Sequence, residues 1–235
     1  MSLVPIILAV TSTLVWLGFY VGIRALPGAR ARQLRWIIGS AVVAAAWLVG
    51  VFLLGGAGFF RNDALPPRIP MALVGTLLLG YLLLLSSTFR RIIAAVPQHW
   101  LIGIQAYRIF GDVFLLRYFT GQLPGLFALP AGIGDVTTGL LAAFVAYAWY
   151  SGKPYARSAA IAVNLFGMAD LVNAVTMGVL TGGAGFVFPI ILIPAYAVPR
   201  AFLIHSYSLI GLLRKTSQQP RRAEALHYGM DAARA

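Results

Sequence analysis

The sequence has no cysteine and little charge. The absence of cysteine excludes disulfides, thiolate-ligated metals and a cysteine nucleophile. Charged residues make up only 10% of the 235 residues, against roughly 25% in an average soluble domain, and 60% are hydrophobic. Apolar runs of about 20 residues, the length that crosses a ~30 Å hydrocarbon layer, recur along the chain. The composition therefore predicts an all-α integral membrane protein embedded in the lipid bilayer.

Lysine and histidine are also scarce. The only lysines, Lys153 and Lys215, fall in predicted cytoplasmic segments, which excludes a buried retinal Schiff base. His99 and His205 lie on different predicted spans, and a haem held between them is one alternative. Apart from that alternative, the sequence predicts no cofactor and no metal.

The net charge of +12 does not form a nucleic-acid-binding pattern. No basic stripe with interleaved aromatic residues and no nucleic-acid module is present, so no nucleic acid partner is expected. The basic residues lie instead in short segments between apolar runs, where they orient a membrane protein.

Seven apolar spans predict a seven-transmembrane-helix bundle. Alternate connections hold most of the 18 basic residues, whereas the opposite connections hold only Arg61 and Arg68. By the positive-inside rule, the N-terminus is predicted outside and the C-terminus in the cytoplasm. The predicted spans are residues 3–24, 35–60, 69–89, 97–119, 133–150, 158–181 and 187–213. The basic residues of the predicted cytoplasmic side are Arg24, Arg30, Arg32, Arg35, Arg90, Arg91, Lys153, Arg157, Arg214, Lys215, Arg221, Arg222 and Arg234.

A short internal repeat suggests how the helices are grouped. The pentapeptide GGAGF occurs at residues 55–59 and again at 182–186. Two parallel three-helix units joined by a linking helix would follow, a 3+1+3 layout also used by SWEET-type sugar transporters. The domain organisation predicted from these patterns is a transmembrane domain over residues 1–214 and a short basic cytoplasmic tail over 215–235.

The few polar residues inside the spans are the candidate site. Three of the six acidic residues fall in or at the ends of predicted spans, where an ionisable side chain is costly. An α-helix would place Gln105, Arg108 and Asp112 on one face. Two arginines and three aspartates leave one carboxylate in excess, which could bind a cation or a proton. The candidate residues are Gln105, Arg108, Asp112, Asp135, Asp170, Asn173, Tyr196 and Arg200.

A second interpretation rests on a motif. The segment GIGD at residues 132–135 resembles the GxGD motif of intramembrane aspartyl proteases, the presenilin-like family. The resemblance pairs Asp135 with Asp112, although Gly111 stands where that family has tyrosine. Pro194 and Ala195 match two positions of the family's PAL motif. The resemblance implies a catalytic dyad of Asp112 and Asp135 that activates water.

The polar residues inside the predicted spans favour a non-enzymatic function over an aspartyl-protease activity. We expect a protein of the plasma membrane, of the bacterial inner-membrane type. It would bind or translocate a small polar solute or ion, with proton coupling as one form of the activity. Three alternatives remain open: the aspartyl-protease-like enzyme, a cofactor-binding protein, and a non-catalytic subunit whose polar face meets a partner membrane subunit or a second copy of the chain. In the last case the charges would be interhelical ion pairs.

Overall fold

The computed structural model describes residues 4–60, 68–182 and 187–216. It is 85% helical, and no strand occurs within these residues. The predicted all-α fold is therefore confirmed. The elements are α1 (Val4–Ala25), α2 (Arg30–Gly56), α3 (Arg68–Leu83), α4 (Ser87–Ala95), α5 (Gln98–Gly103), the 3₁₀-helix η1 (Ile104–Gly111), α6 (Asp112–Phe119), α7 (Gly125–Tyr150), α8 (Ala156–Leu180), the π-helix η2 (Ile193–Ala197) and α9 (Val198–Thr216).

Several of these helices are long and apolar enough to cross a membrane. Within the described residues they are α1, α2, α7 and α8, and α3 with α4 makes a fifth if that bent pair is one span. Large apolar side chains such as Val43, Leu78 and Phe144 are exposed along the outside of the molecule, as expected for surfaces that contact lipid. These features are those of a membrane-resident protein.

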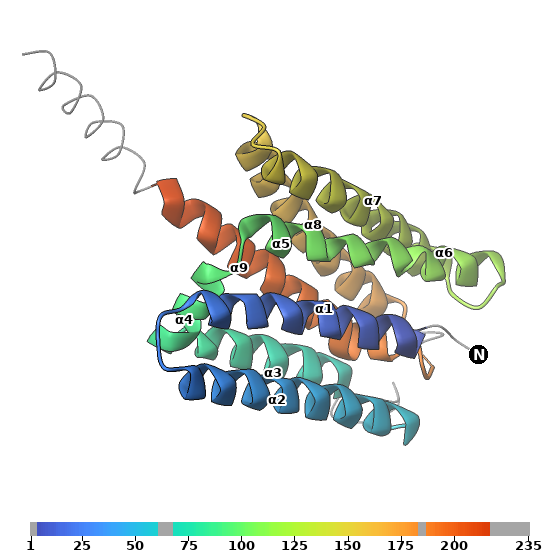
Figure 1. Cartoon of the computed structure of the whole chain (residues 1–235). Helices are drawn as coiled ribbons and strands as arrows, with labels where there is room; N and C mark the ends of the chain where they lie inside the picture. Colours follow the sequence, from blue (N-terminus) through green and yellow to red (C-terminus); the bar gives the residue numbers. More distant parts are fainter. Residues whose placement is uncertain (1–3, 61–67, 183–186, 217–235) are drawn as a thin grey trace, which may run out of the picture.

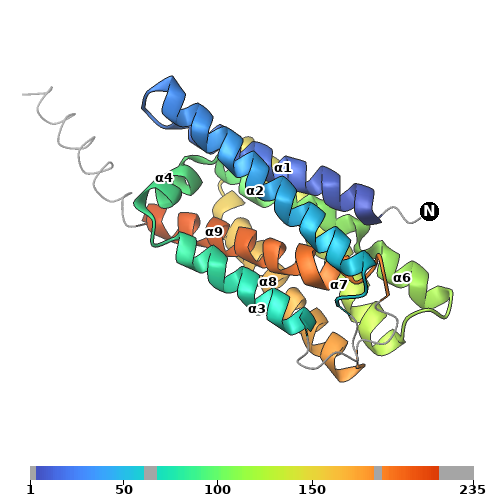
Figure 2. The same ribbon diagram turned by 90° about the horizontal axis from the view of Figure 1, so that it is seen from below.

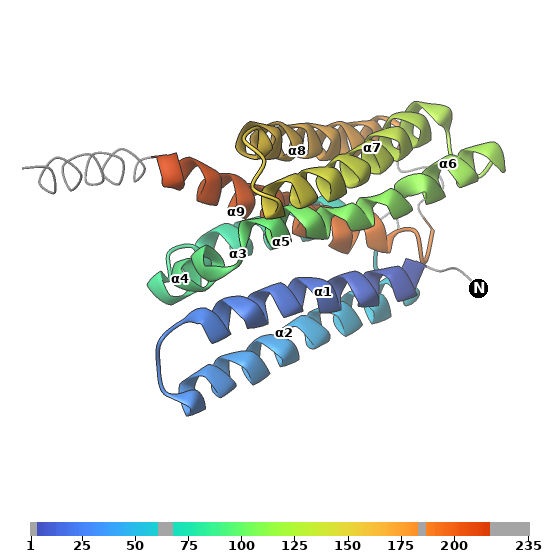
Figure 3. The ribbon, with the colours of Figure 1, turned by 45° about the horizontal axis from the view of Figure 1, so that its top comes forward.

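Apart from α4, the helices run roughly along one common direction (Figure 1). The α1–α2 hairpin lies to one side, and α7, α8 and the α5–η1–α6 rod lie to the other (Figure 3). Between them runs α9, which packs against α3, α5 and α8, as the view from below also shows (Figure 2). The helix α9 is thus the central element of the bundle.

Three predicted spans are irregular in the structure, and one of them, 187–213, contains the π-helix η2 before α9. The predicted span 69–89 ends as α3 at Leu83, and α4 then turns away by 94°. The predicted span 97–119 is divided into α5, η1 and α6, because residues Ile104–Gly111 wind as a 3₁₀-helix.

The helix α7 also differs from the prediction. It begins at Gly125, eight residues before the predicted start at 133, and continues through Pro130. Asp135 therefore lies about 15 Å inside the helix at a rise of about 1.5 Å per residue, rather than at its beginning. The C-terminal helix reaches Thr216, and the remainder of the predicted tail lies outside the described residues. Most of the second GGAGF segment also lies outside them, so the internal repeat stays a prediction.

The buried interior has two apolar clusters along the helix direction. One cluster includes Phe114, Phe127 and Ala131, together with Ile190 of the segment before η2. The other gathers the residues Ile102, Ala142, Val145, Ala160, Val163 and Leu212. Between these two clusters, the buried residues include the polar side chains of Arg108, Thr138, Asn164, Asp170 and His205. A polar layer thus lies between two apolar ones.

Candidate functional site

Arg108 of η1 is the centre of the polar layer. Its residue surface is only 3% exposed. Its Nε donates to Asp135 Oδ1 on α7 at 2.6 Å, and its Nη2 donates to Asp170 Oδ2 on α8. Its Nη1 donates to the backbone carbonyl of Gly167 at 3.1 Å. All three guanidinium nitrogens are therefore bonded, and one cation faces two carboxylates.

His205 of α9 continues the network from Arg108. The Arg108 Nη1 lies 3.3 Å from His205 Nε2, and His205 Nδ1 lies 3.0 Å from Asn164 Oδ1. A guanidinium only donates and a carboxamide oxygen only accepts. His205 must therefore accept at Nε2 and carry its proton on Nδ1, which makes it neutral.

The same network extends toward the end of the bundle where α5 begins. Asn164 Nδ2 donates to Ser208 Oγ at 2.9 Å, and Gln98 Nε2 donates to that oxygen at 2.7 Å. Gln98 Nε2 also donates to the Ser208 carbonyl at 3.1 Å. Hydrogen-bonded side chains thus connect α5, η1, α7, α8 and α9 through the buried interior.

Glycines make room for the charged side chains. A Cβ at Gly134 would overlap the carboxylate of Asp170, and one at Gly111 would overlap Asp135. A Cβ at Gly167 would overlap the ring of His205. In the GIGD segment, Gly134 therefore allows α7 and α8 to approach closely enough for Arg108 to reach both aspartates.

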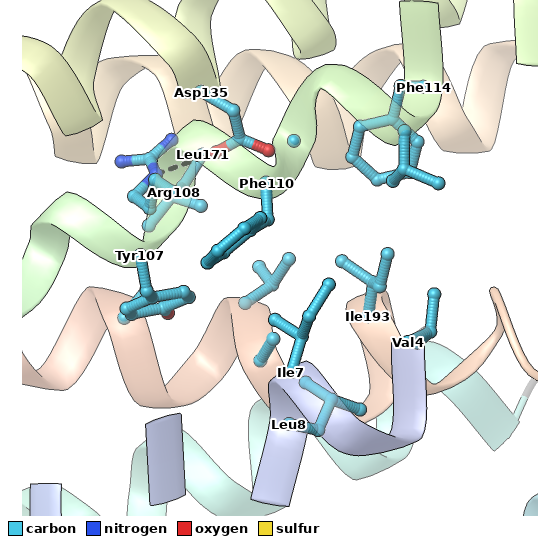
Figure 4. A pocket seen from close by; sticks show the side chains of 15 residues that line it. Val4, Ile7, Leu8, Tyr107, Arg108, Phe110, Phe114, Asp135, Leu171 and Ile193 are labelled. Atoms are coloured by element: carbon cyan, nitrogen blue, oxygen red, sulfur yellow. Dashed lines mark hydrogen bonds and ion pairs between the residues drawn. The ribbon is translucent and has the colours of Figure 1, made fainter. Parts of the chain in front are cut away.

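A small cavity reaches this cluster from the end of the bundle where α1 begins (Figure 4). It offers about 60 Å³ of space to the centre of a water molecule, enough for a few waters at roughly 10–15 Å³ each. Arg108 and Asp135 lie on one side of it, and apolar side chains such as Ile7, Phe110 and Ile193 lie around the rest. Asp135 is therefore the carboxylate of the cluster that lines open space, and Asp170 is not among the lining residues.

Gln105 and Thr138 add unpartnered polar atoms to the same layer. Gln105 Nε2 donates to the Ala201 carbonyl at 2.9 Å, but Gln105 Oε1 is buried without a hydrogen-bond partner. Thr138 Oγ1, one turn beyond Asp135, is likewise buried and unpartnered. Burying such atoms costs free energy, and neither residue is among those that line the cavity.

Arg200 lies in a separate group of contacts. Its Nη1 donates to Ser12 Oγ at 2.6 Å, and its Nη2 donates to Thr11 Oγ1 at 2.8 Å. Its Cζ lies 4.9 Å from the ring centroid of Tyr196 and 5.4 Å from that of Tyr107. Because Ser12 already donates to the Leu8 carbonyl, the Tyr196 hydroxyl donates to Ser12 at 2.8 Å. Hydroxyl dipoles and aromatic faces, rather than any carboxylate of the described residues, compensate this cation.

Asp112 and Arg200 thus do not share the network of Arg108. Asp112 is exposed on α6 and makes no ion pair with another described residue. The reason is the winding of η1. Three residues per turn stack Gln105, Arg108 and Gly111 on one buried face and turn Asp112 away. The dyad implied by the protease resemblance would need Asp112 beside Asp135, yet Asp135 is paired with Arg108.

The other predicted residues are placed as follows. Asn173 is half-buried on α8, three residues beyond Asp170. The ring of His99 packs against Tyr150, with centroids 5.6 Å apart, whereas His205 is fully buried with both ring nitrogens bonded. The two histidines therefore do not form a pair of haem ligands. No group of three metal-ligating side chains occurs within the described ranges.

Sequence reasoning missed several members of the network. It did not include Gln98, Asn164 or Ser208, and it treated His205 only as a ligand candidate. A signal was present, because His205, Ser208 and Leu212 share one face of α9 at spacings of three and four residues. No spacing in the sequence indicated which residues of other helices pair with this face of α9.

Fold and site together define a class: an all-helical protein with several membrane-length apolar helices and a buried charged layer. Residues 66–213, more than half of the chain, match the family described as "Domain of unknown function (DUF8737)", and the chain belongs to that family. No curated protein and no solved structure matches the chain. The matched segment includes all of the Arg108 network but excludes α1, which provides the Thr11 and Ser12 contacts of Arg200.

Proposed function

We propose that this protein is a multi-pass protein of the cell membrane that binds a small polar solute or ion at the Arg108–Asp135–Asp170 cluster and moves it across the bilayer. The observation that carries the proposal is the charge balance of the cluster. One guanidinium faces two carboxylates in a buried layer, which leaves one negative charge in excess. An uncompensated charge inside a membrane protein is expensive, so a cation or proton is needed to balance it.

The two carboxylates have different roles in this proposal. Asp170 is buried and bonded to Arg108 on the side away from the cavity, so it positions the guanidinium. Asp135 is more exposed, with 16% of its side-chain surface accessible, and it lines the cavity. Asp135 therefore binds the cation or proton, and Arg108 keeps the second carboxylate compensated.

The cavity limits what can bind. A volume of about 60 Å³ suits an ion or a few water molecules, and a larger solute would need the helices to move apart. The wall includes Ile193 and Ala197 of η2, and single π-helical turns are frequent at functional sites. The widened backbone of η2, which contains Pro194 and is followed by Pro199 in α9, is the segment best suited to such a movement.

Arg200 provides a second binding group in this proposal. Tyr107, one of its two aromatic contacts, lines the cavity that contains Asp135. Arg200 has no carboxylate partner among the described residues, so its guanidinium would bind the anionic group of a solute. The cavity would then lie between the carboxylate of Asp135 and the ring of Tyr107, which packs against the guanidinium of Arg200.

We further propose seven membrane crossings with the N-terminus outside. Six would be α1, α2, α3, α7, α8 and η2–α9, and the α5–η1–α6 rod would be the seventh. The α1–α2 and α7–α8 connections, α4 and the end of α9 lie at one end of the bundle (left in Figure 1). Together with the helix ends that flank them, these segments hold most of the basic residues of the described chain, which favours a cytoplasmic location for that end.

Cation binding can be tested by thermal unfolding of the purified protein in detergent. The melting temperature would be measured in lithium, sodium, potassium and choline chloride at constant ionic strength. A cation present at 100 times its Kd stabilises by about 2.7 kcal/mol, or about 5–11 °C for a chain of this size. We expect one small cation to raise the melting temperature relative to choline, and Asp135→Asn to remove the effect.

Proton transfer needs a separate assay in liposomes that enclose a pH-sensitive dye. If the bound ion is a proton, an imposed negative-inside potential should acidify liposomes with the wild-type protein but not those with Asp135→Asn. Asp112→Asn is the matched control and should behave as wild type, because Asp112 is exposed outside the network. Equal melting temperatures in all four salts, together with no Asp135-dependent proton uptake, would show that the proposal is wrong.

A further inference from the structure

The bend between α3 and α4 forms a pocket at the basic end of the bundle. The two helices meet at 94°, and Ser86 caps α4 by accepting a hydrogen bond from the Phe89 amide at 3.3 Å. α4 is amphipathic, with Ile92 buried against the bundle and the neighbouring Arg91 exposed. A short amphipathic helix that crosses the end of a membrane bundle lies at the level of the lipid headgroups.

The pocket lies between α4, α5 and α9 and combines apolar walls with cationic groups. It offers about 290 Å³ to the centre of a water molecule. Ile93, Leu101 and Ile210 are among its apolar lining residues, and Arg90 and Arg214 are its charged ones. None of its lining residues in the described part of the chain is acidic.

Arg90 is held at the wall of the pocket. Its Nη1 donates to the carbonyls of Leu84 and Leu85 at 2.6 Å and 3.1 Å, so the side chain is fixed beside the bend. Within the described residues only Arg108 forms ion pairs with an aspartate, so Arg90 has no carboxylate counter-ion there. A half-buried guanidinium of this kind suits a phosphate group.

We propose that this pocket binds an anionic phospholipid. The phosphodiester would lie between Arg90 and Arg214, and the acyl chains would run along the apolar residues toward the membrane interior. Basic pockets between helices at the cytoplasmic side of a membrane bind anionic headgroups. The position at the bend and the apolar walls favour a lipid over a free phosphate, which would gain nothing from the walls.

Native mass spectrometry of the full-length protein in detergent tests this proposal. Phosphatidylglycerol and phosphatidylcholine would each be titrated into wild type, Arg90→Gln and Arg91→Gln. We expect phosphatidylglycerol to bind more tightly than phosphatidylcholine, and Arg90→Gln to weaken its binding by about fivefold, since a basic residue near anionic lipid contributes about that factor. Arg91→Gln removes the same charge one residue away, outside the pocket, and should change the affinity by less than about twofold.

A second variant leaves the charges in place. Ala94 is exposed and lines the pocket, so Ala94→Trp should occupy it without disturbing either arginine. We expect this variant to lose phosphatidylglycerol binding while keeping its melting temperature in detergent alone. Glycerol 1-phosphate, which lacks acyl chains, should not compete.

Three results would overturn the proposal. The first is unchanged lipid binding in both Arg90→Gln and Ala94→Trp. The second is an equal loss in Arg91→Gln, which would indicate diffuse surface charge. The third is competition by glycerol 1-phosphate at the affinity of the lipid, which would indicate a site for soluble phosphate esters. None of these results bears on Asp135, so the proposed function is tested independently.

Discussion

Replacing Arg108 by glutamine should destabilise the protein more than any single aspartate replacement in the cluster. The variant would leave Asp135 and Asp170 facing each other without the guanidinium that bonds both. Removing one partner of a buried pair costs roughly 3–5 kcal/mol. For a chain of this size, the melting temperature in detergent should fall by about 6–20 °C.

The aspartates allow this effect to be separated into its parts. Asp135→Asn alone leaves Arg108 balanced by Asp170, so no buried charge is left uncompensated and we expect a smaller loss than for Arg108→Gln. Adding Asp135→Asn to Arg108→Gln removes one of the two uncompensated charges and should recover part of the stability. Adding Asp170→Asn as well should recover more, because contacting residues are not additive.

The measurement is differential scanning fluorimetry of the single, double and triple variants, with Asp112→Asn as a surface control that should melt as wild type does. A silent Arg108→Gln would refute the reasoning. So would strictly additive losses in the double and triple variants. Either result would mean that these side chains are not coupled in the folded protein.

Two further predictions concern the packing of the site and the membrane orientation. Gly134→Ala should lower the melting temperature by forcing Asp170 away from α7. The control Gly75→Ala, in open space on α3, should leave the melting temperature unchanged or raise it slightly. Equal changes in melting temperature for the two variants would show that no close approach exists at Gly134. In the cysteine-free chain, a membrane-impermeant thiol reagent should label Thr120→Cys but not Ala29→Cys in intact cells, and the reverse pattern would invert the proposed orientation.

The location of the polar cluster was predictable in part. Composition alone indicated a membrane class, and the rarity of ionisable residues in apolar runs made Arg108, Asp135 and Asp170 candidates. Their exact partners were not predictable. The expectation that Arg108 and Asp112 share one helix face assumed 3.6 residues per turn, and only the folded chain shows the tighter 3₁₀ winding that buries Gly111 and exposes Asp112.

The sequence by itself determined the features that depend on composition and on short spacings. These features are the all-helical class, the apolar helices and the uneven distribution of basic residues. Tertiary structure decided which side chains meet. The position of Asp135 within α7 depends on a helix that continues through Pro130. Its closeness to η1, and that of Asp170 to α7, depend on Gly111 and Gly134. His205 entered the network because α9 lies at the centre of the bundle. Such contacts join residues far apart in the chain, and their geometry is set by helix packing, which no local pattern records.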